Sequence, residues 1–428
     1  MARMVGRPKC DVSCRTGRLM QLIIFEDAGF RNLLPLVYSR CTFNLRCGFN
    51  NLLDKIESAM GRTAESVFVR KELAAVIAER QTRRVNQPAT SDDQLWVNGR
   101  LLLRERLDLP HGAAAWRGDA LVAARLDRAA ASRLAPELLL DTVKLRAALA
   151  TCAAAEVPSS LGDIIEFPWQ LVQQNSGEIM RQCGQTEMRV SGAVDAGATL
   201  LNPDSIHIGE GVRVKAGAVL DAESGPIYVA NNVTIHPCAV VQGPCYIGEG
   251  CTILPGTSLR AGCSVGMVCK IGGEIEGTIF HGYSNKQHDG FIGHSYVGEW
   301  VNLGADTVGS DLKNTYGTVR VPINGRPIDT GERFVGAFIG DHTKTAIRTT
   351  LPTGCVIGYA CNVAVSGFAP TFVPSFSWVT DKGRAINEPQ KALAVARTVV
   401  ARRNRKYSPA EEALFLSVQR TADEIEVV

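Results

Sequence analysis

The most regular feature of the chain is an aliphatic residue at almost every sixth position between about Ile206 and Val365. The longest unbroken run holds eight Val, Ile or Leu residues: Val229, Ile235, Val241, Ile247, Ile253, Leu259, Val265 and Ile271. Shorter runs flank it, at Ile208, Val214 and Leu220 and at Ile339, Thr345, Leu351, Ile357 and Val363. A period of six fits neither an amphipathic helix nor an alternating strand. It predicts a parallel β-helix, a prism of stacked coils in which every sixth side chain points inward.

A second inward position follows each aliphatic residue by four, and it holds small side chains. Six of the thirteen cysteines occupy this position: Cys245, Cys251, Cys263, Cys269, Cys355 and Cys361. Thiols placed in this way serve as small buried hydrophobes. The chain has no CxxC pair, so we expect reduced thiols and neither a disulfide framework nor a metal site.

The N-terminal half alternates strands with helices. Buried strands are expected over Leu22–Phe25 and Gln94–Asn98. Helical patterns cover 70–80, 119–155 and 171–183. This alternation predicts an α/β domain.

Five segments follow from these patterns. They are a disordered extension (1–19), the α/β domain (20–182), a linker (183–192), the β-helix domain (193–380) and a C-terminal helical tail (381–428). In the tail, Ser408 and Glu411 form a capping box, with Pro409 at the first helical position. The basic cluster 402–406 is interpreted as a solvated face.

Charge and hydropathy exclude two classes of partner. The net charge is +3, and the excess comes from residues 1–19, since the remainder holds 41 basic and 42 acidic residues. No global basic character indicates nucleic acid binding. No stretch approaches the ~18 apolar residues that cross a bilayer. We therefore expect a cytoplasmic protein without a nucleic acid or membrane partner.

Four segments resemble a family of bifunctional bacterial enzymes, the UDP-N-acetylglucosamine diphosphorylase/glucosamine-1-phosphate N-acetyltransferases. They are 25–48 (FEDAGFRNLLPLVYSRCTFNLRCG), 96–100 (WVNGR), 167–172 (FPWQLV) and 282–316 (GYSNKQHDGFIGHSYVGEWVNLGADTVGSDLKNTY). The resemblance implies a nucleotidyltransferase-like α/β domain followed by a left-handed parallel β-helix with acyltransferase activity. We also expect a homotrimer, with acetyl-coenzyme A bound between adjacent β-helices.

The resemblance also implies site residues in the β-helix. His288 matches the general base, Asn302 matches a sugar contact, and the backbone amide of Ala305 matches an oxyanion donor. An Arg-x-Gly motif that holds the sugar phosphate matches Arg260, and the family lysine falls near Lys270.

Two further positions match less closely. Asn314 and Tyr316 resemble an Asn-Tyr pair of the family, although an insertion precedes them. Phe291 stands where the family has a tyrosine, so a hydroxyl is missing.

The residue types suit acetyl transfer without the resemblance. An imidazole accepts a proton near neutral pH, an arginine binds phosphate through two parallel hydrogen bonds, and a fixed N–H stabilises an oxyanion. Lys286, His288 and Asn302 interrupt an otherwise apolar, glycine-rich repeat. Polar residues that cluster where a repeat breaks indicate a site, and Lys286 is included as a substrate-binding candidate. His281 and His294 remain rivals of His288 as the base.

Fewer residues support nucleotidyl transfer in the N-terminal half. Asp27 is the candidate Mg²⁺ ligand, and Arg31, Arg40 and Arg46 are candidates for the phosphates of UTP. No G-x-G loop follows Phe25, and an asparagine, at 98, stands where a metal-binding aspartate is expected. The alternative is that these are ordinary loop arginines.

The leading hypothesis is an acetyl-coenzyme A-dependent N-acetyltransferase that acts on a sugar phosphate, glucosamine-1-phosphate, in UDP-N-acetylglucosamine biosynthesis. Its N-terminal domain would then uridylylate the product with UTP and Mg²⁺. An alternative makes nucleotidyl transfer the only chemistry and the β-helix an oligomerisation or regulatory module. A third hypothesis is a non-catalytic sugar-nucleotide sensor. Zinc hydration on the same type of helix needs an H-x4-H pair, which the spacings of His281, His288 and His294 do not provide.

Overall fold

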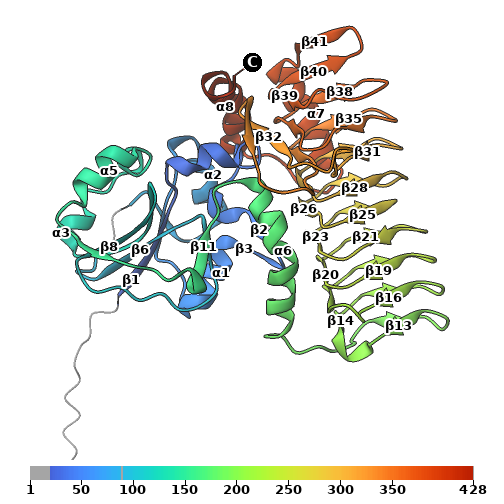
Figure 1. Cartoon of the computed structure of the whole chain (residues 1–428), viewed down its shortest axis with the longest axis horizontal. Helices are drawn as coiled ribbons and strands as arrows, with labels where there is room; N and C mark the ends of the chain where they lie inside the picture. Colours follow the sequence, from blue (N-terminus) through green and yellow to red (C-terminus); the bar gives the residue numbers. More distant parts are fainter. Residues whose placement is uncertain (1–19, 88–89, 428) are drawn as a thin grey trace, which may run out of the picture.

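The computed structural model describes residues 20–87 and 90–427. The extension predicted over residues 1–19 lies outside them. Figure 1 shows an α/β domain beside a tall column of short strands, with the last two helices near the top of the column. Among the helices of the described ranges, none combines the length and the apolarity that a membrane-spanning segment needs.

The N-terminal domain is built on one seven-stranded sheet. Its strand order is β10 (Ala153–Ala155), β8 (Ala113–Arg117), β9 (Ala120–Leu126), β6 (Gln94–Asn98), β1 (Gln21–Phe25), β4 (Ser66–Phe68) and β5 (Arg84–Val85). Strand β1 lies inside the sheet and pairs in parallel with β4 and β6. The main helices of the domain are α1 (Leu52–Met60), α2 (Lys71–Arg80) and α6 (Pro168–Cys183). These elements confirm both predicted strands and two of the three predicted helices.

The helix predicted over residues 119–155 is wrong in large part. Its beginning is strand β9, which pairs with β6 on one side and β8 on the other. Three short helices follow, α3 (Arg128–Ala131), α4 (Pro136–Leu139) and α5 (Thr142–Ala148), and the stretch ends in strand β10. Alanine and leucine favour helices, but pairing on both edges of an inner strand outweighs that weak preference.

The column is a parallel β-helix with three faces. Face I holds β14 (Ile206–Ile208), β17 (Ile227–Val229), β20 (Cys245–Ile247), β23 (Cys263–Val265), β26 (Ile279–Gly282), β29 (Tyr296–Glu299), β34 (Phe338–Ile339), β37 (Val356–Ile357) and β39 (Phe372–Val373). Face II holds β12 (Ala193–Val194), β15 (Arg213–Val214), β18 (Thr234–Ile235), β21 (Thr252–Ile253), β24 (Lys270–Ile271), β27 (Asn285–Lys286), β30 (Asn302–Leu303), β35 (Lys344–Thr345), β38 (Asn362–Ala364), β40 (Ser377–Thr380) and the antiparallel β41 (Gly383–Ile386). Face III holds β13 (Thr199–Leu201), β16 (Val219–Asp221), β19 (Val240–Gln242), β22 (Ser258–Leu259), β25 (Glu274–Glu276) and β28 (Phe291–Gly293), with the pair β31 (Val308–Gly309) and β36 (Thr350–Leu351) beyond it.

The interior of the prism confirms the period read from the sequence. The eight aliphatic residues of the long run are all fully buried in a single core cluster. The six cysteines of the second inward position are buried free thiols. Burial of this apolar column, at roughly 25 cal/mol per Å² of apolar surface, supplies the main driving force for stacking the coils.

Two additions connect the prism to the N-terminal domain. The chain leaves the coils after β31 and forms the hairpin β32 (Arg320–Ile323) and β33 (Arg326–Asp329), whose apolar side chains share a core cluster with the N-terminal domain. The tail forms α7 (Pro389–Ala401) and α8 (Pro409–Ile425), and α8 packs against both α7 and α2. The predicted capping box of Ser408 and Glu411 is present.

A buried ion pair joins the N-terminal domain to face I. Arg40 donates to Asp341 through Nη1–Oδ1 (3.0 Å) and Nη2–Oδ2 (2.8 Å), and its Nη2 lies 3.2 Å from Glu299. The two side chains of the bidentate pair are only 4% and 3% exposed. Nearby, the backbone N–H of Arg46 donates to Tyr296 Oη. Loop 27–48 is therefore fixed on the β-helix by charged and polar contacts.

Replacing Arg40 should destabilise the protein strongly, because Arg40→Ala leaves the Asp341 carboxylate buried without its cation. We expect the free energy of unfolding to fall by about 3–5 kcal/mol, measured by urea denaturation. The control is Arg213→Ala, which removes an exposed pair with Asp195 and should cost less than about 1 kcal/mol. Equal small losses in both variants would contradict a structural role for the buried pair.

Candidate functional site

His288 lies on an exposed turn between faces II and III. Strand β27 ends at Lys286 and β28 begins at Phe291, so residues 287–290 make the turn. In the preceding coil only two residues, Gly272 and Gly273, separate the corresponding strands. A Cβ added to Gly273 would lie 2.8 Å from the carbonyl oxygen of His288. The longer turn thus fits because the coil before it has no side chain at this point.

The next coil brings Asn302 and Ala305 to the same edge. Asn285 is in register with Asn302 and Lys286 with Leu303, so the turn that contains Ala305 stacks on the turn that contains His288. The two asparagines contact each other, with Nδ2 of Asn285 3.4 Å from Oδ1 of Asn302.

Lys270 precedes these asparagines in the same outward column. It is in register with Asn285. The predicted residues Lys270, His288, Asn302 and Ala305 therefore lie on three successive coils along face II and its edge.

Lys286 occupies an inward position and not a place on the surface. It stands in register between Ile271 and Leu303 and is 1% exposed. Its Nζ donates to the carbonyl oxygens of His288 (2.6 Å), Asp289 (3.0 Å) and Gly272 (3.2 Å). Burial lowers the pKa of Lys286 to about 8. The side chain contacts the backbone of the His288 turn, a role that the sequence did not reveal because the six-residue period lapses here.

Three other predicted residues lie away from this edge within the chain. Arg260 follows β22 at the far edge of face III, where its Nη1 pairs with Glu276 (2.6 Å) and Glu274 (3.2 Å). Asn314 and Tyr316 lie on the exposed segment that leaves the prism after β31. One chain alone does not bring these residues to His288.

The two rival histidines have defined partners. Nδ1 of His281 is 2.8 Å from Tyr296 Oη, and burial lowers the pKa of this imidazole well below its ordinary value. His294 is partly exposed, and its Nδ1 lies 2.7 Å from Asp311 Oδ2. A carboxylate partner of this kind fixes the orientation of an imidazole, so His294 is the stronger rival of His288.

Asp27 follows the inner strand β1, and both of its carboxylate oxygens accept hydrogen bonds. Arg100 donates to both carboxylate oxygens, through Nε (2.7 Å) and Nη2 (2.6 Å), and Asn98 Nδ2 donates to Oδ2 (2.8 Å). The Asp27 and Arg100 side chains are buried. A guanidinium thus occupies the position where a cation would bind, and these residues do not fit a Mg²⁺ ion. Within residues 20–87 and 90–427, no group of three His, Cys, Asp or Glu side chains is arranged to hold a metal.

The three candidate arginines do not gather around Asp27. The guanidinium of Arg31 lies over the Phe30 ring at 4.9 Å from its centroid. Arg40 forms the buried pair with Asp341, and Arg46 Nε is 3.4 Å from the carbonyl oxygen of His281. Arg40 and Arg46 therefore face the β-helix.

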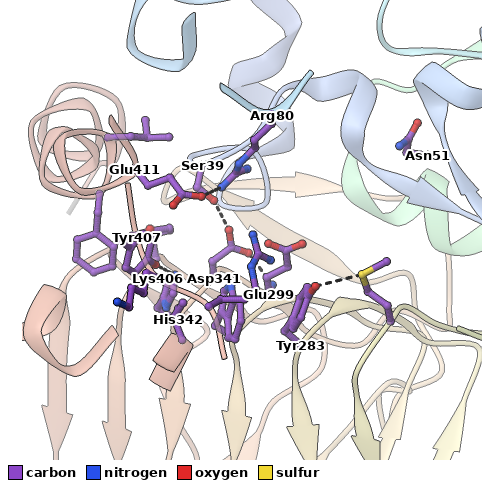
Figure 2. Close-up of a pocket in the computed structure, with 17 residues that line it drawn as sticks. Ser39, Asn51, Arg80, Tyr283, Glu299, Asp341, His342, Lys406, Tyr407 and Glu411 are labelled. Atoms are coloured by element: carbon purple, nitrogen blue, oxygen red, sulfur yellow. Dashed lines mark hydrogen bonds and ion pairs between the residues drawn. The ribbon is translucent and has the colours of Figure 1, made fainter. Parts of the chain in front are cut away.

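A cavity of about 550 Å³ lies where the N-terminal domain, the β-helix and the tail meet (Figure 2). Ser39 and Arg80 line it from the first, Tyr283 and Glu299 from the second, and residues 405–415 from the third. Sequence reasoning missed this cavity because its walls come from segments hundreds of residues apart and share no local motif.

Known proteins match this chain in two separate parts. Residues 22–186 match the sugar nucleotidyl transferase family, and residues 226–261 match six bacterial transferase hexapeptide repeats. With the three-faced coils, these matches confirm the predicted fold class, a nucleotidyltransferase-like α/β domain followed by a left-handed parallel β-helix. Both matched families are described as transferases, so each of the two parts of the chain resembles a transferase domain.

Individual relatives align over short stretches. A bifunctional sugar-1-phosphate nucleotidylyltransferase/acetyltransferase of Sulfurisphaera tokodaii is 38% identical over 92 residues, which is 21% of this chain and 23% of that protein. The bifunctional protein GlmU of Methanococcus maripaludis is 34% identical over 85 residues, 20% of each chain. The chain thus spans about a quarter or less of these curated relatives. The structure of an Arabidopsis UDP-N-acetylglucosamine acyltransferase covers 56% of this chain and 98% of its own, with 13% identity and a TM-score of 0.26.

The buried Lys286 should make stability depend on pH. In the unfolded chain a lysine keeps a pKa of 10.5, against about 8 in the folded protein. The unfolded state therefore binds more protons between these two values, and the free energy of unfolding of the parent protein should rise relative to Lys286→Met as the pH increases through this window. Urea denaturation at about pH 7.5 and about pH 9.5 measures the difference. The control is Lys382→Met, on the surface, whose free energy of unfolding should change with pH as that of the parent does. If the free energy of unfolding of Lys286→Met also changed with pH as that of the parent does, the prediction would be contradicted.

Proposed function

We propose that this chain is a cytoplasmic, homotrimeric N-acetyltransferase that transfers an acetyl group from acetyl-coenzyme A to glucosamine-1-phosphate, a step in UDP-N-acetylglucosamine biosynthesis. The observation that carries the proposal is the edge where His288, Asn302 and Ala305 stack on adjacent coils. The hexapeptide repeats and the names of the two bifunctional relatives support the same chemistry.

In the proposed reaction the sugar amine attacks the thioester carbonyl carbon. The imidazole of His288 accepts a proton from the substrate ammonium, which frees the lone pair that forms the C–N bond. The backbone N–H of Ala305 stabilises the oxyanion of the tetrahedral intermediate. The attacking nitrogen then loses its second proton, the C–S bond breaks, and the thiolate leaves and takes up a proton as free coenzyme A. The Asn302 amide holds the sugar during these steps.

Exposed apolar side chains support assembly of the β-helix with other copies. Val308, Ile347 and Phe368 lie after Ala305, the first of them on the same coil, and are 36%, 68% and 73% exposed. Exposed apolar surface of this kind is typical of an interface. A trimer would allow Arg260, Asn314 or Tyr316 of one copy to approach the His288 edge of another.

His288→Ala should lower kcat/KM for acetyl transfer at least about a hundredfold, because general base catalysis typically contributes 10²–10⁴-fold. The assay is thiol release from acetyl-coenzyme A with glucosamine-1-phosphate, and light scattering should still find trimers. His294→Ala is the matched control and should retain most of the activity. Near-normal turnover of His288→Ala, with loss in His294→Ala, would transfer the role of the base to the His294–Asp311 pair.

A second candidate function is nucleotidyl transfer by the N-terminal domain, with the β-helix as an oligomerisation or regulatory module. The family match of residues 22–186 supports it. Because Arg100 and Asn98 hold both oxygens of Asp27, we expect no pyrophosphate release from UTP, Mg²⁺ and a sugar-1-phosphate above the background without protein. Release that disappears in Asp27→Asn would contradict this expectation and establish the second function.

A further inference from the structure

A second, smaller cavity lies beside Asn302, between face II and the turn that follows α7. Its volume is about 200 Å³, enough for several water molecules at about 30 Å³ each. It is lined by Tyr283, Asn285, Trp300, Asn302, Lys344, Val399, Arg402 and Arg403. Three of these residues are cationic, two are amides and none is acidic. The cavity therefore combines positive charge with groups that can hydrogen-bond to hydroxyls.

The position of the cationic residues follows from the fold. Lys344 begins β35 and is in register with Asn302, so the two side chains are neighbours on face II. Helix α7 ends at Ala401, and the next two residues, Arg402 and Arg403, line the cavity. Nη2 of Arg403 donates to Asn285 Oδ1 at 3.0 Å. Arg402 stays exposed, as the interpretation of this basic cluster as a solvated face predicts, whereas that interpretation is wrong for Arg403, which is partly buried and contacts the β-helix.

Aromatic contacts hold the turn in place. The guanidinium of Arg405 lies over Tyr283 and Trp300, at 5.2 and 5.9 Å from the ring centroids. The two rings stack on each other at 4.4 Å. Two residues further on, Tyr407 Oη is 2.7 Å from His342 Nε2. Because these contacts hold the segment after Arg403 on the β-helix, and Arg403 itself contacts Asn285, Arg403 needs little reordering to bind an anion.

The positive charge of Lys344, Arg402 and Arg403 is not neutralised by any acidic residue in the lining of the cavity. Nζ of Lys344 donates to a backbone carbonyl, that of His342, and burial lowers the pKa of this amine to about 8. Arginine guanidinium groups bind phosphate through paired, charge-assisted hydrogen bonds. By contrast, Arg260, the predicted phosphate ligand, already pairs with Glu274 and Glu276. The lining therefore suits a phosphate group better than Arg260 does in this chain.

We infer that this cavity binds the phosphate of the acceptor sugar, with Arg402, Arg403 and Lys344 around the phosphate and Asn285 and Asn302 against the sugar. The inference rests on the proposed acetyl transfer and adds residues of the tail to that site. His288 follows Asn285 by three residues on the same coil, and three extended residues span at most about 10 Å. A hexose phosphate bridges a separation of this order, so its amine can approach the His288 turn while its phosphate stays in the cavity.

Steady-state kinetics with two acceptors test the inference. The double variant Arg402→Ala/Arg403→Ala should raise the KM for glucosamine-1-phosphate at least about tenfold, because it removes charge-assisted hydrogen bonds to the phosphate. The KM for acetyl-coenzyme A and the rate with unphosphorylated glucosamine should stay within about twofold of the parent. Arg420→Ala, an exposed arginine on α8, is the matched control. If the KM for acetyl-coenzyme A rises and the KM for glucosamine-1-phosphate does not, the cations bind the acetyl donor and the inference is overturned. An unchanged KM for both substrates would overturn it as well.

A binding experiment separates this inference from the proposed function. Glucosamine-1-phosphate and inorganic phosphate should raise the Tm of the parent protein and of Arg420→Ala, and not that of the double variant. The stabilisation should weaken above about pH 8, because Lys344 must be protonated to attract the anion. If no acetyl transfer occurs but this pattern of binding is found, the phosphate site stands and the proposed reaction fails. If acetyl transfer is normal in the double variant and its Tm responds like that of the parent, the phosphate site fails and the reaction stands.

Discussion

The bidentate pair of Arg40 and Asp341 determines how the N-terminal domain and the β-helix are joined. A guanidinium and a carboxylate that are almost fully buried must face each other, because each would otherwise lose its hydration without compensation. The pair therefore holds loop 27–48 against the β-helix. In open α/β sheets, ligands bind beyond the carboxyl ends of the strands, and in this domain the loop after β1 instead forms one wall of the junction with the β-helix.

The acidic side chains at the end of β1 are likewise bound by other residues of the protein. Glu26 accepts from the backbone N–H of Thr42 and from Arg70, and Asp27 is held by Arg100 and Asn98. Each acidic side chain after β1 thus has a protein partner, and the carboxyl ends of β1 and β6 are joined by a network of buried charges. In this arrangement the two acids after β1 stabilise the fold of the domain and have no free carboxylate oxygen to offer a ligand.

Much of the β-helix could be predicted from the sequence, and little of the junction could. The six-residue period identified the inward column from Val229 to Ile271 because each coil repeats one local geometry. The six-residue period does not predict the inward position of Lys286, because this position holds a lysine whose amine is hydrogen-bonded to backbone carbonyls. Strand β9 was mistaken for a helix because its alanines are compatible with both conformations, and only pairing on both edges decides between them. The cavity beside Asn302 depends on tail residues such as Arg403, which are more than a hundred positions away in the chain, so no local pattern reports it.

The end of α8 has a consequence for the order in which the molecule is completed. Glu426 accepts hydrogen bonds from Tyr38 Oη (2.7 Å) and from the N–H (2.8 Å) and Oγ (2.7 Å) of Ser375. One late residue therefore links a loop near the beginning of the chain to the uppermost coils. During synthesis the α/β domain can fold first and the coils can add one after another as they leave the ribosome. The two halves are connected at this point only after residue 426 has emerged, so a nascent chain must hold its finished parts side by side without that bond.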